Sequence, residues 1–241
     1  ISACLVGSEM CIRDRREAGL LEQRRDFQGR PQARLDFLKS LGVSPVAGSR
    51  LISLFAYENA GVASWLQALA DDGQPTHLLV PEGRVLADVQ RWLGEEPLAP
   101  GCPQVRQSLT VQVLPFVRQE DYDRLLWCCD FNAVRGEDSF VRAQWAGRPM
   151  LWHIYRQDED IHLDKLEAFL GLYTRTLSPG AKAAVLALWQ AWNSEASMAE
   201  PWKNLLQYWP EVAAHAEQWC LEQGSQPDLA AALVQFYLNW I

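Results

Sequence analysis

The chain has 241 residues, of which 49% are hydrophobic, and its 30 acidic and 22 basic residues give a formal net charge of -8. This length is sufficient for one substantial core, and no apolar run reaches the roughly 18 residues that a membrane span needs. The acidic balance argues against a nucleic-acid-binding or anionic-membrane-binding surface, so a small anionic ligand would need a local basic site. The six cysteines lack zinc-site spacing and are typical of reduced thiols in a cytoplasmic protein, so no metal site is predicted.

The first 15 residues, ISACLVGSEMCIRDR, do not fit the rest of the chain. They lack the uncharged apolar core and cleavage site of a signal peptide, and they lack the Arg/Ser-rich amphipathic pattern of a transit sequence. Residues 1–15 resemble translated adapter or vector sequence, and we expect them to be non-native; a genuine N-terminal strand is the alternative. The predicted domain is therefore 16–241.

Strands and helices alternate through the first part of this domain. Ligands bind such folds beyond the C-terminal ends of the strands, because the alternation builds a parallel sheet covered by helices on both faces. The predicted fold class is therefore α/β, with a Rossmann-like parallel sheet. Residues 95–104 are predicted to form a long loop. The predicted strands are 50–57, 76–80, 109–115, 131–134 and 150–155, and the predicted helices are 16–28, 31–41, 60–71, 83–94, 119–129 and 138–146.

The sequence after Asp160 is predicted to be helical, in segments around 161–173, 180–193, 201–221 and 227–240, with Pro210 interrupting the third. Six of the 11 tryptophans lie in the last 53 residues. We interpret most of them as helix-packing groups, because large aromatic side chains bury much apolar area, with a sugar-binding platform as the alternative.

Aromatic side chains follow two of the predicted strands. Phe55 and Tyr57 are two residues apart, so a strand that reaches Tyr57 would present both rings on one face. Ordinary alternation of core residues is the other interpretation. Phe116, Gln119 and Tyr122 follow the strand 109–115 and enter the next helix. An aromatic ring beside an amide can stack on a nucleobase and both donate and accept hydrogen bonds.

The turn Arg135–Ser139 follows a buried strand and opens a short helix. Acidic and hydroxyl residues at a helix start satisfy its free N–H groups, and those N–H groups with the helix dipole can instead hold a phosphate. Spacing alone leaves both interpretations open. Gly136 allows the backbone to approach a ligand closely. Arg142, one helical turn beyond Asp138, is predicted to form a salt bridge rather than to bind a ligand.

Three segments carry a more specific resemblance: LISLFAYEN at 51–59, LPFVRQEDYDRLLWCCDFN at 114–132 and RGEDSFVRAQWAGRPMLWHIY at 135–155. They closely resemble the EarP protein-arginine rhamnosyltransferase family, over the second half of a family member. The resemblance implies the donor-binding C-terminal domain of a GT-B glycosyltransferase, followed by C-terminal helices, with the N-terminal acceptor domain absent. The implied reaction transfers rhamnose, with inversion, from dTDP-β-L-rhamnose to an arginine of translation elongation factor P, without metal or cofactor.

The resemblance also implies roles for individual residues. Glu137 matches a residue that the family requires for activity, and we assign it to positioning the donor or the incoming arginine. Tyr122 departs from the family pattern by its hydroxyl group, which affects hydrogen bonding more than stacking. The positions implied to bind dTDP-rhamnose are Phe55 and Tyr57 beside the thymidine and sugar phosphate, Phe116, Gln119 and Tyr122 around the base, and Arg135, Gly136, Asp138 and Ser139 around the diphosphate.

The family's proton acceptor is an aspartate of the N-terminal domain, so residues 16–241 alone are expected not to rhamnosylate elongation factor P. Two alternatives are another GT-B glycosyltransferase with a different sugar or acceptor, and a non-catalytic nucleotide-binding module. Two histidines give weaker indications of function than these residues do. We interpret His153 as a core imidazole on a buried strand, and His162 as part of a helix start after the acidic run 158–160 rather than as a metal ligand.

Overall fold

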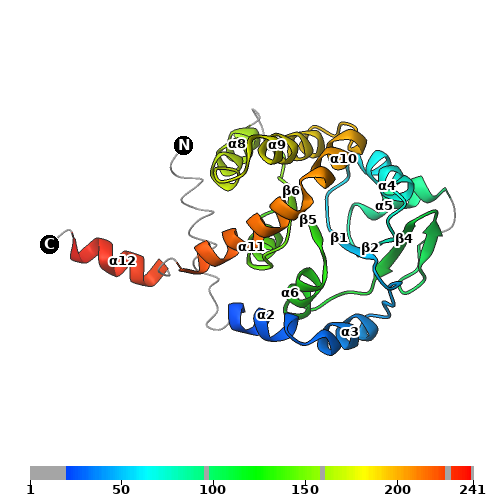
Figure 1. Cartoon of the computed structure of the whole chain (residues 1–241), viewed down its shortest axis with the longest axis horizontal. Coiled ribbons are helices and arrows are strands. Elements are labelled where there is room, and N and C mark those ends of the chain that lie inside the picture. Colours follow the sequence, from blue (N-terminus) through cyan, green and yellow to red (C-terminus); the bar gives the residue numbers. More distant parts are fainter. Residues whose placement is uncertain (1–19, 95–97, 158–160, 226–228, 240–241) are drawn as a thin grey trace.

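The computed structural model describes residues 20–94, 98–157, 161–225 and 229–239. Figure 1 shows the strands at the centre of the molecule, with helices α8–α10 along one side and α2, α3 and α6 along the other. The strands are β1 (Arg50–Leu54), β2 (Thr76–Pro81), β3 (Gln104–Arg106), β4 (Leu109–Leu114), β5 (Phe131–Arg135) and β6 (Met150–His153). The helices are α2 (Leu20–Gln28), α3 (Pro31–Ser40), α4 (Val62–Asp71), α5 (Leu86–Leu93), α6 (Gln119–Cys128), α7 (Asp138–Trp145), α8 (Ile161–Tyr173), α9 (Pro179–Asn193), α10 (Ala199–Gln207), α11 (Trp209–Ser225) and α12 (Leu229–Leu238).

The strands form one sheet in the order β3-β4-β2-β1-β5-β6. The pairs β4–β2, β2–β1, β1–β5 and β5–β6 are parallel, whereas the edge pair β3–β4 is antiparallel. The chain runs outward from β1 through β2 and β4, and then returns to the other side of β1 with β5 and β6. This reversal puts the topological switch point between β1 and β5, where doubly wound sheets bind their ligands. The predicted Rossmann-like α/β fold is confirmed.

The core occupies both faces of the sheet. Ile52 and Leu54 of β1 pack on one face with Trp65 of α4, and Leu51 packs on the other face with Leu125 of α6. Successive strand side chains point to opposite faces, and here both faces are covered by helices. This double burial explains why the strands are almost continuously apolar rather than alternating.

The C-terminal helices are held to the sheet by aromatic packing. Trp65 lies edge to face with Trp192 and Trp202, with ring centroids 5.5 Å and 5.4 Å apart, and all three side chains are at most 1% exposed. Phe131 of β5 joins them at 5.1 Å from Trp202. The tryptophans of α9 and α10 therefore pack helices, as the sequence predicts.

Three strands end earlier than predicted, β4 by a single residue and β1 and β6 by more, and one strand was missed. β1 ends at Leu54 and β6 at His153, so the residues after each of these strands belong to loops at the edge of the sheet. The predicted loop 95–104 runs into β3, which pairs with β4. The three residues of β3 are exposed, so they lack the apolar pattern that identifies a buried strand.

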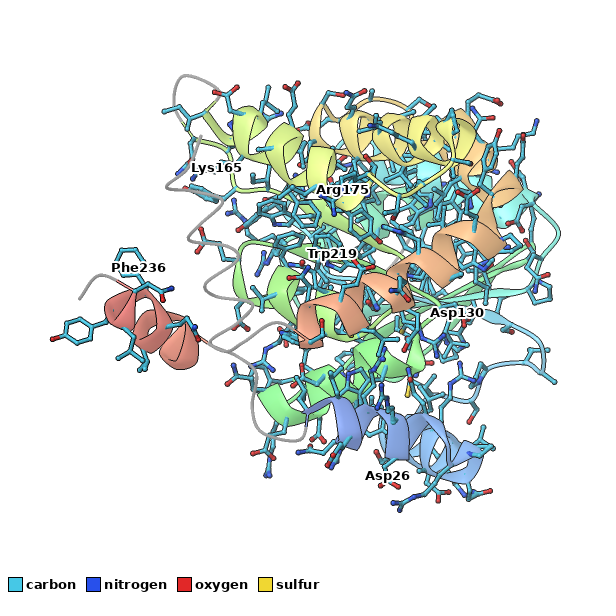
Figure 2. All side chains as sticks on the ribbon, turned by 60° about the vertical axis from the view of Figure 1, so that its left-hand side comes forward. Asp26, Asp130, Lys165, Arg175, Trp219 and Phe236 are labelled. Atoms are coloured by element: carbon cyan, nitrogen blue, oxygen red, sulfur yellow. The ribbon has the colours of Figure 1, made fainter. Side chains whose placement is uncertain are left out.

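The predicted helix 201–221 is two helices, α10 and α11. Pro210 lies in the first turn of α11, where its missing N–H costs no intrahelical bond, so the break falls before it. Residues 1–15, and the start of the predicted helix 16–28, lie outside the described residues. Figure 2 shows α12, which carries Phe236, lying apart from the other helices. No helix in the described ranges is long and apolar enough to cross a bilayer.

Candidate functional site

A cavity of about 440 Å3 opens at the C-terminal ends of β1, β2, β4 and β5. It contains all ten residues that the sequence assigned to a site, namely Phe55, Tyr57, Phe116, Gln119, Tyr122, Arg135, Gly136, Glu137, Asp138 and Ser139. Pro81, Glu82, Pro115 and Val117 also line it and were not predicted. The structure thus brings the predicted residues together at the switch point of the sheet, although their individual roles remain predictions.

An aromatic wall with a central cation forms one side of the cavity. The guanidinium carbon of Arg135 lies 4.3 Å from the ring centroid of Phe55 and 5.0 Å from that of Tyr57. Phe55 also meets Tyr122 edge to face at 6.0 Å. The strand alternation expected for Phe55 and Tyr57 is wrong, because β1 ends at Leu54. Both rings nevertheless line the same cavity, because they reach it from the loop after the strand.

Another part of the cavity lining comes from the entry to α6. The ring of Phe116 is 86% exposed, so it is available to stack on a flat ligand without displacing protein contacts. Gln119, the first residue of α6, is also exposed. Burial raises the pKa of the Tyr122 phenol well above its ordinary value, so that side chain is neutral at physiological pH.

The turn into α7 provides backbone groups. Gly136 has a φ of +61°, and an added Cβ would lie 3.2 Å from the hydroxyl oxygen of Tyr57, so glycine allows this turn to close against the aromatic wall. Glu137 precedes the helix, does not cap it and is exposed; its carboxylate forms no hydrogen bond or ion pair with the described residues. The first N–H groups of α7 have no intrahelical acceptor, which leaves them able to bind an anion.

The hydroxyl group of Ser139 forms hydrogen bonds within the turn. It is buried, donates a short hydrogen bond to the backbone oxygen of Arg135 and accepts one from the Arg135 N–H at 3.2 Å. Because these contacts already use the hydroxyl proton, the side chain stabilises the turn. Only the main-chain N–H of Ser139 remains suited to hold a diphosphate oxygen.

The salt bridge predicted for Arg142 is confirmed. Its Nε donates to Asp138 at 3.0 Å, and its guanidinium also reaches Asp123 of α6 at 2.6 Å. The carboxylate of Asp138 is therefore neutralised from the side of the helix.

His153 is buried in the core, as expected, and packs against Tyr57 with ring centroids 5.3 Å apart. Burial, with smaller effects of the nearby cations Arg156 and Arg135, lowers its pKa from the ordinary 6.5 to about 4. Within the described chain its Nδ1 has no hydrogen-bond partner, in contrast to the satisfied imidazole that the sequence suggested.

A depressed histidine pKa makes the folded state less stable as pH falls below the unfolded pKa of 6.5, until the folded pKa near 4 is passed. When the pH falls from 7 to 5, we therefore expect the parent to lose about 1 to 2 kcal/mol more of its unfolding free energy than His153→Leu loses. Urea unfolding at the two pH values measures this difference. Carboxylates titrate in both proteins, so identical pH dependence of parent and variant would contradict the prediction.

No group of three or more His, Cys, Asp or Glu side chains in the described residues could hold a metal ion. The Nδ1 atom of His162 accepts a hydrogen bond from the Gln157 N–H at 3.3 Å.

Burial raises the pKa of the Cys128 thiol to about 12 and that of Cys220 to about 11, so these cysteines are protonated core residues.

Glu82 is the charged residue among the four lining residues that the sequence interpretation missed. It comes directly after β2, a fully buried strand, in the same way that the predicted site residues come after their own strands. An added Cβ at the next residue, Gly83, would lie 3.2 Å from the Phe55 ring. The glycine that follows this buried strand was the sequence signal that could have added the end of β2 to the predicted site.

Comparisons with known proteins place these features in a family. The family model described as Elongation-Factor P (EF-P) rhamnosyltransferase EarP matches residues 15–238. Proteins named protein-arginine rhamnosyltransferase are 60% identical in Pseudomonas putida and 59% identical in Pseudomonas aeruginosa, over 93% and 94% of this chain. The chain spans 59% and 60% of the length of these two relatives. A solved structure concerning EarP-mediated arginine glycosylation of translation elongation factor EF-P superposes with a TM-score of 0.86, at 57% identity, over 94% of this chain and 72% of that one.

Proposed function

The chain belongs to the EarP family of elongation factor P rhamnosyltransferases, and from this we propose that residues 16–241 form the donor-binding domain of a GT-B protein-arginine rhamnosyltransferase. The proposed donor is dTDP-β-L-rhamnose, and the proposed acceptor is an arginine side chain of translation elongation factor P. The observation that supports this best is the cavity at the switch point, where aromatic rings, one guanidinium and a helix N-terminus converge.

The parts of the cavity match the parts of the donor. Thymine is flat, and the exposed ring of Phe116 offers a stacking surface beside the amide of Gln119, which can both donate and accept. The diphosphate is anionic and suits Arg135 together with the free N–H groups of α7. We propose that the sugar lies between these two ends, near Glu137.

In the proposed reaction, a nitrogen of the acceptor guanidinium attacks the anomeric carbon of rhamnose while the bond from that carbon to the dTDP oxygen breaks. The guanidinium loses a proton to a base on the acceptor side, and dTDP leaves with the electron pair. Arg135 and the α7 N–H groups stabilise the charge that grows on the diphosphate. Glu137, exposed at the cavity and unpaired within the described chain, orients the donor or the incoming guanidinium.

Calorimetric titration of the chain with dTDP tests donor binding, and Phe116→Ala tests the base end. We expect this variant to lose about 1 to 2 kcal/mol of dTDP binding free energy, the scale of one lost base stack. The ring is 86% exposed, so the fold should be unaffected. Val105→Ala removes another exposed apolar side chain, 71% exposed on edge strand β3 and outside the described lining, and should bind like the parent. A folded parent chain without dTDP binding would contradict the proposed function.

A further inference from the structure

The charges that line the cavity do not by themselves favour a diphosphate. Its described lining includes the carboxylates of Glu82, Glu137 and Asp138, but a single guanidinium, that of Arg135. The whole chain also carries a formal net charge of -8. Like charges at a partly buried site repel more strongly than in water, because the effective dielectric constant is lower. Positive charge beyond the lining can offset this repulsion, in addition to the free N–H groups of α7.

Arg142 provides such a charge. Its side chain is 12% exposed and lies behind the described lining, where its Nε donates to Oδ2 of Asp138 at 3.0 Å. The Asp138 carboxylate is 47% exposed and lines the cavity. The Arg142 guanidinium is shielded from water while the Asp138 carboxylate is half exposed, so the attraction between them is partly screened.

Arg142 also connects the two ends of the cavity. Its Nη1 donates at 2.6 Å to Oδ2 of Asp123, the residue after Tyr122 on α6. The helix that carries Tyr122 is thereby tied to the helix whose N-terminus opens on the cavity. A guanidinium can contact two carboxylates through different nitrogens, which fixes their relative positions.

We propose that Arg142 is a positioning residue for the diphosphate of the donor. It neutralises the Asp138 carboxylate and holds it toward the helix, so that the free N–H groups at the start of α7 face the anion. This inference rests on the proposed donor-binding function and deepens it. In this arrangement Asp138 binds the diphosphate through its main-chain N–H. Its carboxylate repels the diphosphate when Arg142 is absent.

The inference gives opposite expectations for the two ends of the ion pair. Arg142→Gln should lower dTDP affinity about tenfold, because it leaves the Asp138 carboxylate without its cation. Asp138→Asn should raise dTDP affinity about threefold, because it removes a negative charge and keeps the Arg142 guanidinium. Thymidine has the base and ribose without phosphate, so its affinity should change much less than that of dTDP in both variants. Calorimetry with thymidine and dTDP therefore separates the diphosphate end from the base end.

Arg124→Gln is the matched control. It removes the same charge from α6, but Arg124 is 51% exposed, pairs with Asp121 and lies outside the described lining of this cavity. We expect both of its affinities to equal those of the parent.

The outcomes separate the inference from its premise. An equal loss of thymidine and dTDP affinity in Arg142→Gln would show a purely structural role and overturn the inference, and so would no loss at all. Where Arg142→Gln does not fold, Asp138→Asn decides, because weaker dTDP binding by that variant contradicts the proposed charge balance. A folded parent chain that binds no dTDP overturns the proposed function together with the inference.

Discussion

Glu137→Gln is expected to lower rhamnosyl transfer by about a hundredfold or more, while dTDP affinity does not fall below that of the parent. The carboxylate of Glu137 is exposed at the cavity and forms no hydrogen bond or ion pair with the described residues, so it contributes little to the resting structure. A carboxylate beside a diphosphate does not favour ground-state binding, because their charges repel. Its expected contribution therefore appears when the cationic acceptor and the sugar react.

Turnover is measured by mass spectrometry of elongation factor P, with the protein completed to the length of its curated relatives. Calorimetric titration of the same variant with dTDP measures its dTDP affinity. Glu120→Gln serves as the control, because Glu120 is an exposed acidic residue in the first turn of α6 and lies outside the described lining. Parent-like turnover by Glu137→Gln, or a loss explained entirely by weaker dTDP binding, would refute the assigned role.

The elements that bury apolar residues on both faces of the sheet were predictable from sequence. The apolar runs of β1, β2 and β5 predicted a parallel sheet, and a parallel sheet directs attention to the residues after each strand. Their exact ends were not predictable. The run that includes Phe55 and Tyr57 is typical of a strand, but the last bond to β5 is from the Phe55 N–H to the Ala133 oxygen at 2.9 Å, after which the chain leaves the sheet. The strand therefore ends where its backbone hydrogen bonds to β5 end, and the residue types alone do not show this point.

Charge compensation at the site was only partly predictable. The pair Arg142–Asp138 is expected from a separation of four residues on one helix, which brings two side chains to the same face. The pair Arg142–Asp123 joins two helices, so it depends on how α6 and α7 pack. The hydroxyl of Ser139 shows the same limit, because its bond to the Arg135 oxygen depends on the shape of the turn. Residue types indicated an anion site, whereas packing decides which polar groups remain free.

Arg135→Ala is expected to weaken dTDP binding by about 2 to 3 kcal/mol, the upper range for a lost hydrogen bond to a charged group. Arg135 carries the single guanidinium in the described lining. Its guanidinium carbon lies 4.3 Å from the ring centroid of Phe55 and 5.0 Å from that of Tyr57, and these rings hold it in position. Its loss removes positive charge from a lining that also contains Glu137 and Asp138. Thymidine binding should change much less, because the base end of the cavity is intact.

Two further variants separate charge from geometry in the same titration. Arg135→Lys keeps the charge but lacks the planar group that stacks on both rings, so we expect an affinity between those of the parent and Arg135→Ala. Arg118→Ala removes an exposed arginine next to the start of α6, outside the described lining, and should bind dTDP within about twofold of the parent if the position of the charge matters more than net charge. Equal losses in Arg118→Ala and Arg135→Ala would mean that dTDP responds only to the overall charge of the protein, and the assignment of its diphosphate to the turn before α7 would then be wrong.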